Sequence, residues 1–389
     1  MADWGLVEAG PATRAHGDQA EVRAKLSKLR AAMGAAEVEA VYLEGWANVA
    51  WLTGGRGNRV VLDSPRGLCG LLVTDSGAWL LVPNNEEARV RAEPFADLPL
   101  PVVVRPWYQL PLWQSALAAV PSATRWASDV AVPGWGAAEP LLASDRQRLG
   151  EADVSRYRAL GLDATEALET ALLEAREGWS ELEVAGTVAA AHKARDIEAG
   201  VVLVGTRARA ERFRHLVPTP ATVEGGLIAS VTAERHGLHA SVTRCLSFGA
   251  PPAELLEKHA TVVAVDRAYL AGSRPGITLG DAFRGGEQAY ASGGFYDDWK
   301  EHHQGGTTGY AGREVFAKPE ETYTLEAGMA TAWNPTIPGA KSEDTYLVTA
   351  EGLEWLTRNP GSEWPLSGAD EDIPRVGILE RRPGGGASA

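Results

Sequence analysis

The fold is decided by residues 333–348, WNPTIPGAKSEDTYLV. Trp333 opens this segment, and a β-prone run, Thr345–Val348, ends it. Between them lie Pro335, Pro338 and Gly339, residue types that are typical of turns. The pattern therefore predicts a strand, a turn and a second strand.

An acidic pair, Glu343-Asp344, stands where the second strand is expected to begin. Carboxylates at the start of an otherwise apolar strand need a cation or hydrogen-bond donors nearby. Two interpretations stay open from these residues alone. The pair belongs to a functional site, or it is solvated charge at the end of a strand.

Length and composition indicate a two-domain globular protein. A chain of 389 residues exceeds a typical single core, and 45% hydrophobic and 23% charged residues are ordinary values. The net charge of −14 argues against nucleic acid and against an anionic membrane surface as partners. The chain has no apolar run of about 18 residues, so no membrane span is expected.

Cysteine usage and the first residues favour a cytoplasmic location. Cys69 and Cys245 lie in apolar, strand-like runs and are predicted to be buried free thiols. The opening residues, MADWGLVEAG, lack the basic and apolar regions of a secretory signal.

The first half reads as an α/β domain over residues 18–150, after a loose arm at residues 1–17. Val22, Leu26, Leu29 and Met33 recur at helical spacing and predict a helix from about Asp18. Strands are then expected at 40–43, 67–73, 78–83 and 102–104, with a helix beginning within 84–93.

The second half reads as a different domain over residues 151–375, followed by a flexible tail at 376–389. Apolar residues from Tyr157 to Leu172 recur at helical spacing. Ser180 and Glu183 form a capping box that starts a second helix, through about Arg195. A buried strand is expected at 201–204, further strands at 227–232 and 241–247, and helices at 253–270 and from about 280.

Four segments of the second half resemble, in order, those of the pita-bread family, which includes methionine aminopeptidase, prolidase, aminopeptidase P and creatinase. They are RFRHLVPTP (212–220), ASVTAERHGLHASVTRC (229–245), HHQGGT (302–307), and Gly328-Met329 followed by Trp333-Asn334-Pro335 and Glu343-Asp344. The phrase NVAWLTGG (48–55) is similar to the creatinase-type N-terminal domain. The resemblance implies an α/β N-terminal domain of creatinase type, an α+β pita-bread C-terminal domain, and a homodimer.

The resemblance also shows where this chain departs from its relatives. The family's five metal-ligand positions read here Ser230, Ser241, Gly306, Asn334 and Glu343. Two divalent ions need several anionic or imidazole ligands, so no dinuclear centre, and no metal or cofactor, is expected. A single-metal site is the alternative, because four histidines lie in the matching segments, of which only His302 is expected to face the pocket: His236, His239, His302 and His303.

Three residues are the candidates for catalysis. The resemblance places His215 as a general base, which suits an imidazole that titrates near neutrality. Glu343 would orient water, accept a hydrogen bond from the substrate, or act as a nucleophile. His302 matches a histidine near the substrate in the peptidases. In the alternative interpretation His215 is a surface histidine and Glu343 pairs with Lys341, Arg244 or Arg313.

A second group of residues is expected to bind substrate. Arg313 can clamp a carboxylate bidentately, and Asn334 keeps the shape of a metal-bridging glutamate without its charge. Gly305 and Gly306 are expected to leave room for a ligand and to offer backbone N–H donors. The other candidates are Arg244, His303, Tyr310, Trp333, Ser230 and Ser241, with Arg59 of a partner subunit's glycine-rich turn beside Arg56 and Asn58.

The function expected from these residues is metal-independent hydrolysis of a C–N bond in a small substrate that carries a carboxylate. The bond would be an amide, an amidine or a cyclic amidine, as the likeness to creatinase implies. Three alternatives stay open: a lyase or cyclase acting on a small metabolite, a non-catalytic module that binds peptides or ligands, and a residual metal-dependent aminopeptidase.

Overall fold

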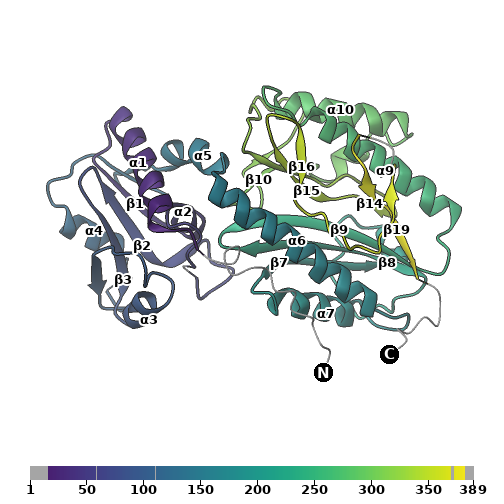
Figure 1. Ribbon diagram of the computed structural model, residues 1–389, viewed down its shortest axis with the longest axis horizontal. Coiled ribbons are helices and arrows are strands. Elements are labelled where there is room, and N and C mark those ends of the chain that lie inside the picture. Colours follow the sequence, from purple (N-terminus) through teal and green to yellow (C-terminus); the bar gives the residue numbers. More distant parts are fainter. Residues whose placement is uncertain (1–15, 58, 110, 369–371, 382–389) are drawn as a thin grey trace. The chain divides into compact units, whose positions relative to one another are not determined.

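The computed structural model describes residues 16–57, 59–109, 111–368 and 372–381. The chain divides into two compact units (Figure 1). One unit holds Arg14–Arg156 with His236–Leu238, and the other holds Tyr157–Arg235 and the chain from His239 onward. Of the predicted N-terminal arm, residues 1–15 lie outside the described residues.

The N-terminal unit is built on a six-stranded mixed sheet in the order β4-β3-β2-β1-β5-β6. Its elements are α1 (Gln19–Ala35), β1 (Ala40–Gly45), α2 (Trp46–Leu52), β2 (Arg66–Thr74), β3 (Ala78–Pro83), α3 (Glu87–Ala92), β4 (Val102–Arg105), α4 (Trp113–Ala119), β5 (Trp126–Ser128), β6 (Gly136–Ala137) and α5 (Glu139–Gln147). The predicted α1 forms as expected: Asp18 caps it by accepting from the Glu21 N–H, and its apolar positions are buried.

The C-terminal unit contains two main sheets. A four-stranded sheet has the order β19-β9-β8-β7, and a five-stranded sheet has the order β11-β10-β12-β15-β16. The elements of the first part are α6 (Glu151–Glu174), α7 (Glu181–Lys193), β7 (Glu198–Thr206), α8 (Arg207–Ala210), β8 (Gly226–Arg235), β9 (Leu238–Phe248), α9 (Ala253–Gly272) and α10 (Leu279–Ser292). The later elements are η1 (Asp298–Glu301), β10 (Gly305–Thr308), β11 (Val315–Phe316), β12 (Ala330–Trp333), β13 (Thr336–Ile337), β14 (Ala340–Lys341), β15 (Asp344–Val348), β16 (Leu353–Trp355), β17 (Leu366–Ser367), β18 (Arg375–Val376) and β19 (Ile378–Arg381).

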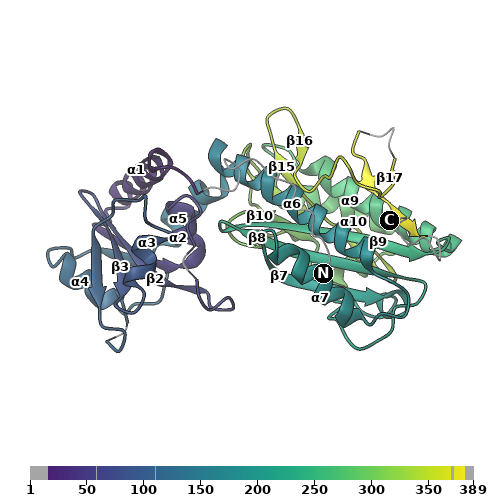
Figure 2. The ribbon, with the colours of Figure 1, turned by 60° about the horizontal axis from the view of Figure 1, so that its bottom comes forward.

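Helices surround these sheets. In Figure 2, α7 lies beside β7, the strand against which it packs. The capping box predicted at the start of α7 is present, because Ser180 and Glu183 exchange hydrogen bonds. The turn between β8 and β9 has positive φ at both His236 (56°) and Gly237 (84°), as a two-residue hairpin of this twist requires.

A buried ion network fixes the start of β15. Arg244 pairs with Glu169 (Nε–Oε1 2.7 Å) and with Asp344 (Nη1–Oδ1 3.1 Å). Arg375 pairs with Asp266 (2.5 Å) and with the other oxygen of Asp344 (3.0 Å). Both oxygens of Asp344 are held by guanidinium groups, so this buried carboxylate is paired within the core.

Most predicted elements are present, and Cys69 and Cys245 are buried and unpaired as predicted. Three expectations were wrong. Residues 376–381 are not a flexible tail, because β19 pairs in parallel with β9. Trp333 ends β12 rather than opening the strand pair. Val201, expected in a buried strand, is 42% exposed.

Candidate functional site

A small cavity lies in the C-terminal unit, with a volume of about 220 Å³. Loops and strands from both main sheets contribute to its wall. Its polar lining consists of His215, Ser230, Thr232, His302, His303, Arg313, Asn334, Lys341 and Glu343. Seven of these nine are residues that the sequence singled out for the site, and the structure brings them together.

Glu343 is the only carboxylate in this lining, and its charge is balanced by the chain itself. Lys341 Nζ lies 3.1 Å from Oε2, and Arg313 Nη2 lies 3.6 Å from Oε1. The Thr243 hydroxyl donates to Oε2 at 2.8 Å. Burial raises the pKa of Glu343, but Lys341 and Arg313 outweigh it and hold the pKa below its usual value. Glu343 is therefore an ionised, paired group, as the alternative interpretation of the sequence had it.

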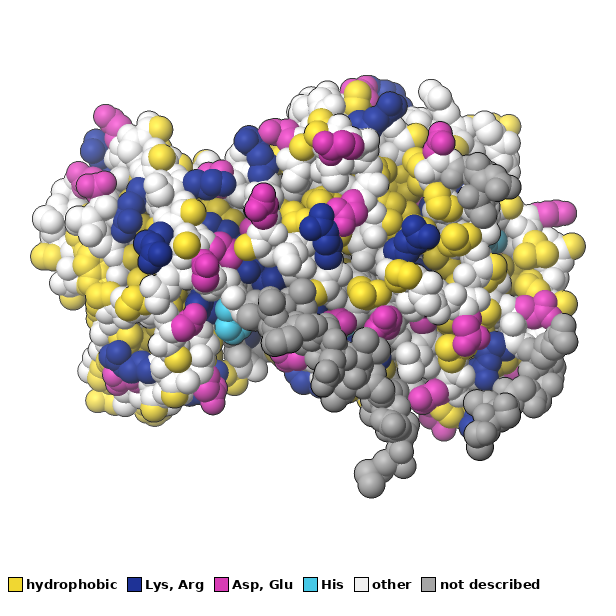
Figure 3. Space-filling model, in the orientation of Figure 1, with side chains coloured by type: hydrophobic (Ala, Val, Ile, Leu, Met, Phe, Trp, Pro, Cys, Tyr) yellow, Lys and Arg dark blue, Asp and Glu magenta, His cyan; other side chains and the backbone are white. Residues whose placement is uncertain are grey.

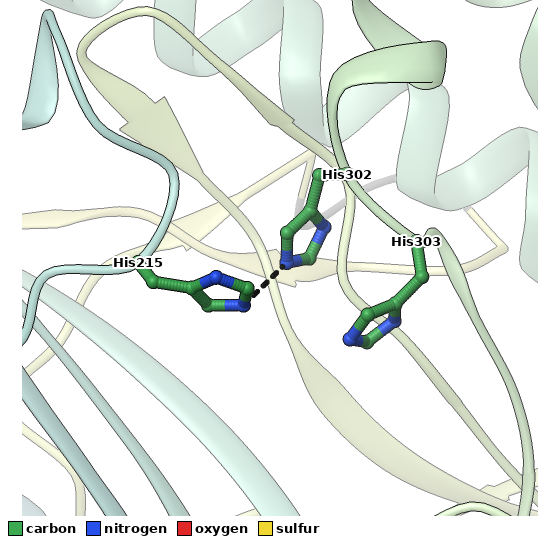
Figure 4. Close-up of side chains that lie close together, drawn as sticks. All are labelled: His215, His302 and His303. Atoms are coloured by element: carbon green, nitrogen blue, oxygen red, sulfur yellow. Dashed lines mark hydrogen bonds between the residues drawn. The ribbon is translucent and has the colours of Figure 1, made fainter.

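Three histidines meet at one side of the cavity (Figure 4). His215 and His302 face each other with 3.2 Å between their Nε2 atoms. The rings of His302 and His303 stack with 4.4 Å between centroids. One ring nitrogen from each residue can be chosen so that all three lie within 4.8 Å of one another. The sequence expected only His302 to face the pocket, and that expectation was wrong for His303.

His302 and His303 are neutral at ordinary pH because of where they lie. Burial lowers the pKa of His302 to about 2, and the charge of Lys341 adds to the effect. Burial also lowers the pKa of His303 to about 4, followed by the charge of Arg313. Protonating either ring would place a third positive charge beside two existing cations, so both rings keep a free lone pair.

Framework residues that the sequence did not indicate hold this cluster in place. The Gln304 side-chain amide donates to the backbone carbonyl of His302 (2.6 Å) and accepts from the Tyr290 hydroxyl (2.8 Å). Arg214 pairs with Asp298 of η1 at 2.6 Å, which joins the loop of His215 to the segment before His302. Arg214 directly precedes His215 in the sequence.

Three buried polar atoms of the cavity's lining residues have no hydrogen-bond partner among the described residues. They are Nδ1 of His302, the Nε donor of Arg313 and the Oδ1 acceptor of Asn334. Buried polar atoms are nearly always paired, so an unpaired donor and acceptor in one cavity indicate a missing ligand or water. Arg313 and Asn334 were predicted to bind substrate.

Other candidates lie away from the cavity. Trp333 is fully buried, stacks on Tyr269 with 4.4 Å between centroids, and donates to Ser273 Oγ at 2.8 Å. Arg244 belongs to the core ion network, and Tyr310 is fully buried. Ser241 is also buried and shares a hydrogen bond with the Thr232 hydroxyl (3.2 Å), outside the cavity lining.

The glycine pair does not serve as expected. Gly306 lies in β10 between Phe316 of β11 and Ala332 of β12, with φ at 143°. A Cβ there would collide with the carbonyl oxygen of Val315, and a Cβ at Gly305 with that of Ala332. The pair is needed for close strand packing, and it does not line the cavity.

The glycine-rich turn of the N-terminal unit has its own contacts. The Arg59 guanidinium lies over the Trp46 ring, 3.9 Å from its centroid. Arg56 is fully buried and pairs with Asp97 at 2.5 Å, and Asn58 lies outside the described residues. The predicted role of this turn in a partner's site stays a prediction.

Comparison with known proteins places this arrangement in a family. The family model of metallopeptidase family M24 matches residues 156–350, and the creatinase/prolidase N-terminal domain model matches residues 25–138. The chain belongs to metallopeptidase family M24. The predicted pita-bread resemblance and the two-domain fold class are thereby confirmed.

Individual M24 relatives are distant. An uncharacterized peptidase of Staphylococcus aureus strain MW2 is 23% identical over 354 residues, covering 86% of this chain and 98% of its own. The prolidase of Pyrococcus horikoshii OT3 is 20% identical with a TM-score of 0.71, covering 87% of this chain and 99% of its own. Dipeptidase PepE of Mycobacterium ulcerans is 20% identical with a TM-score of 0.73, covering 90% and 98%. At such identity the structures show the shared fold alone.

One further structural neighbour is the N-terminal domain of the FACT complex subunit SPT16 from chickpea. It is 10% identical, with a TM-score of 0.65, and the match covers 88% of this chain and 97% of that domain. This fold is therefore shared with a chain that is not named as a peptidase.

The dinuclear centre implied by the family does not fit this member of M24. Of the five ligand positions, Ser230 is hydrogen-bonded to Thr243 (2.6 Å), and Glu343 is already paired with Lys341 and Arg313. No histidine fits at Gly306 without moving β11. Two divalent ions would meet one carboxylate and two fixed cations, so the donor set cannot offset their charge.

Proposed function

We propose that this M24 protein hydrolyses a C–N bond in a small substrate that carries a carboxylate, without the two-metal centre of its family. The observation that carries the proposal is the unpaired couple of Arg313 Nε and Asn334 Oδ1. A carboxylate accepts from the first, and an amide or amidine N–H donates to the second. One ligand of this class satisfies both buried atoms.

The size of the cavity limits the substrate. A volume of about 220 Å³ is below the range of roughly 300–1,000 Å³ that is usual for drug-sized ligands. N-acyl amino acids, dipeptides and cyclic amidines with a carboxylate are of suitable size. Dipeptides belong in this class because they are amides with a free carboxylate, and the structural neighbours include a prolidase and a dipeptidase.

His215 is the proposed base. It is exposed toward solvent, its Nε2 lies 3.2 Å from that of neutral His302, and it lines the cavity. In the proposed step His215 takes a proton from water while the water oxygen bonds to the sp² carbon. The C–N bond then breaks, and the proton passes from His215 to the leaving nitrogen. Lys341 and Arg313 supply positive charge for the oxyanion that forms in between.

Glu343 has a supporting role in this proposal. Because both its oxygens face cations, it is a poor nucleophile, and it positions Lys341 and Arg313 instead. This role differs from the roles of water-orienting group and nucleophile that the sequence suggested for Glu343. In this proposal the positive charges of Lys341 and Arg313 take the place of the family's metal ions, in line with the expected metal independence.

The test is a screen of purified protein against N-acyl amino acids, dipeptides and carboxylate-bearing amidines, in water enriched in ¹⁸O. Hydrolysis puts one ¹⁸O atom into the carbonyl product. We expect His215→Ala to lower kcat by about 10²–10⁴. We expect Arg313→Met to raise KM by about 100-fold through loss of a charged hydrogen bond. Arg212→Met, an exposed arginine outside the cavity lining, is the matched control.

The pairing of Glu343 also favours a second function, non-catalytic binding. A pocket whose only acid is neutralised can hold an anionic ligand without turning it over. Binding of these compounds with no product would support the binding module and contradict hydrolysis. A product without ¹⁸O would support a lyase or cyclase, and full activity in His215→Ala would remove the proposed base.

A further inference from the structure

We propose that His215, His302 and His303 hold one divalent transition-metal cation, with a ligand set separate from the five metal positions of family M24. The inference does not require the proposed function, and the two compete for one atom, because an ion bound to Nε2 of His215 would occupy the lone pair that the proposed base uses. The sequence led us to expect no metal, because it did not place these three rings together.

The spacing of the ring nitrogens suits such an ion. Tetrahedral zinc with Zn–N bonds of about 2.0–2.1 Å places its nitrogen ligands roughly 3.3–3.4 Å apart. The Nε2 atoms of His215 and His302 are 3.2 Å apart. The third nitrogen, from His303, completes a set within 4.8 Å, and Figure 4 shows the three rings converging from two chain segments. His303 is exposed, so its ring can turn to close this gap.

The ligand type selects the metal class. Three imidazoles with no carboxylate among them suit zinc, copper, nickel or iron, and they do not suit magnesium or calcium, which prefer oxygen. A metal also needs unprotonated rings. The Nε2 atoms of His215 and His302 face each other at hydrogen-bond distance, so one of these rings already presents an unprotonated nitrogen to the other.

The positive charges near the three histidines oppose binding of a metal ion, and this effect can be measured as a change in metal affinity. Lys341 and Arg313 repel a cation, while Glu343 offsets one of the two charges. Lys341 lines the same cavity as the three histidines. Removing its charge should therefore tighten metal binding. A metal bound elsewhere on the molecule would not respond.

The competing explanation is a neutral histidine pair, in which one Nε2–H donates to the other Nε2. Both explanations fit a distance of 3.2 Å. The two explanations differ in the number of metal ions bound per chain, which is one for the metal site and none for the pair. They also differ in the role of His303, which a simple pair does not need.

The experiment titrates Zn²⁺, and separately Co²⁺, into the full-length chain after chelator treatment and dialysis. Calorimetry gives the stoichiometry, and the visible absorption of Co²⁺ reports tetrahedral nitrogen ligation. We expect one ion per chain. His215→Ala and His303→Ala, both at exposed positions, should each weaken binding by at least about 100-fold. Loss of a group that only orients a ligand already costs about 10- to 100-fold.

His16→Ala is the matched control, because His16 forms another histidine contact with His236, at 5.0 Å between ring centroids. It should leave the Zn²⁺ affinity unchanged, and Lys341→Met should raise that affinity by about 10-fold or more. No stoichiometric binding would overturn the proposal. So would equal affinity in His215→Ala and His303→Ala, or an affinity indifferent to Lys341→Met. Hydrolysis is assayed separately with and without Zn²⁺, so either proposal can fail alone.

Discussion

At Glu343 a single carboxylate meets an ammonium, a guanidinium and a hydroxyl inside one small cavity. The three groups are nearly inaccessible to solvent, so each depends on the others for charge balance. A buried ion pair contributes little net stability, but breaking one by removing a single partner is costly.

Lys341→Met should lower the free energy of unfolding by about 3 kcal/mol, because it leaves Glu343 buried with one loosely placed counter-ion. Urea denaturation of Lys341→Met, Glu343→Gln and the double variant forms a thermodynamic cycle. We expect the double variant to lose clearly less than the sum of the single losses.

Lys318→Met is the control for this cycle. Lys318 pairs with Glu321 on the surface, where its side chain is 67% exposed. Its loss should change stability by no more than about 0.5 kcal/mol. Additive losses at Lys341 and Glu343 would mean that the two charges do not depend on each other.

The sequence indicated Lys341 as a partner of Glu343 and His303 as a substrate-binding candidate, but it did not bring His303 together with His215 and His302. Residues 341 and 343 are two positions apart and share one face of an extended chain, a signal that was available. The resemblance matched His302, and not His303, to a histidine near the substrate in the peptidases. Both rings line the cavity here, in a segment that ends before β10 begins at Gly305 and that is held by Gln304.

Among the elements, β10 carries a backbone that only glycine allows. Its neighbours approach from both sides, β11 and β12, and two successive glycines have positive φ. The strand therefore brings the sheet close behind the cavity without adding side chains to it.

Gly306→Ala should lower the free energy of unfolding by about 3 kcal/mol, through backbone strain and contact with the Val315 carbonyl. Gly309→Ala, just past the end of β10, is the matched control. The nearest atom to its added Cβ is a side-chain oxygen of Glu314 at 3.8 Å. Thermal unfolding of the two variants tests the difference, and equal melting temperatures would show that β11 yields easily.

Helices were easier to predict than strand partners. The periodicity of α1 and the caps of α1 and α7 are local signals, and they gave correct starts. The strand β19 was missed because it is short, lies in a glycine- and proline-rich region, and pairs with β9 more than a hundred residues earlier. Its stability comes from a distant partner rather than from its own sequence.

For the whole molecule, architecture and chemistry separate. The chain shares its fold with a prolidase at a TM-score of 0.71, yet four of the five positions matched to the family's metal ligands carry other residue types. Fold alone therefore does not select the reaction.

On the face shown in Figure 3, acidic and basic side chains are interspersed among the described residues. Among those residues, no helix is long and apolar enough to cross a membrane.

Stability of the whole chain should fall on mild acidification. Burial lowers the pKa of His192 in α7 to about 4, from 6.5. Between pH 4 and pH 6.5 the imidazole of His192 is protonated in the unfolded chain and neutral in the folded chain. Stability is thus full above pH 6.5 and declines toward pH 4, by about 3 kcal/mol for this residue. His192→Gln should reduce the decline measured by urea unfolding at pH 7 and pH 4.5, and His215→Gln should not.

Asp344 and Glu343 are neighbours on the chain and lie on opposite sides of it. One is fastened to Arg244 and Arg375 in the interior, and the other looks into the cavity. If β15 slid by a single residue, the two acids would exchange places, and the cavity would receive the wrong one. The ion pairs of Asp344 with the interior guanidinium groups therefore fix the register of β15. They determine which acid faces the cavity without contacting any ligand.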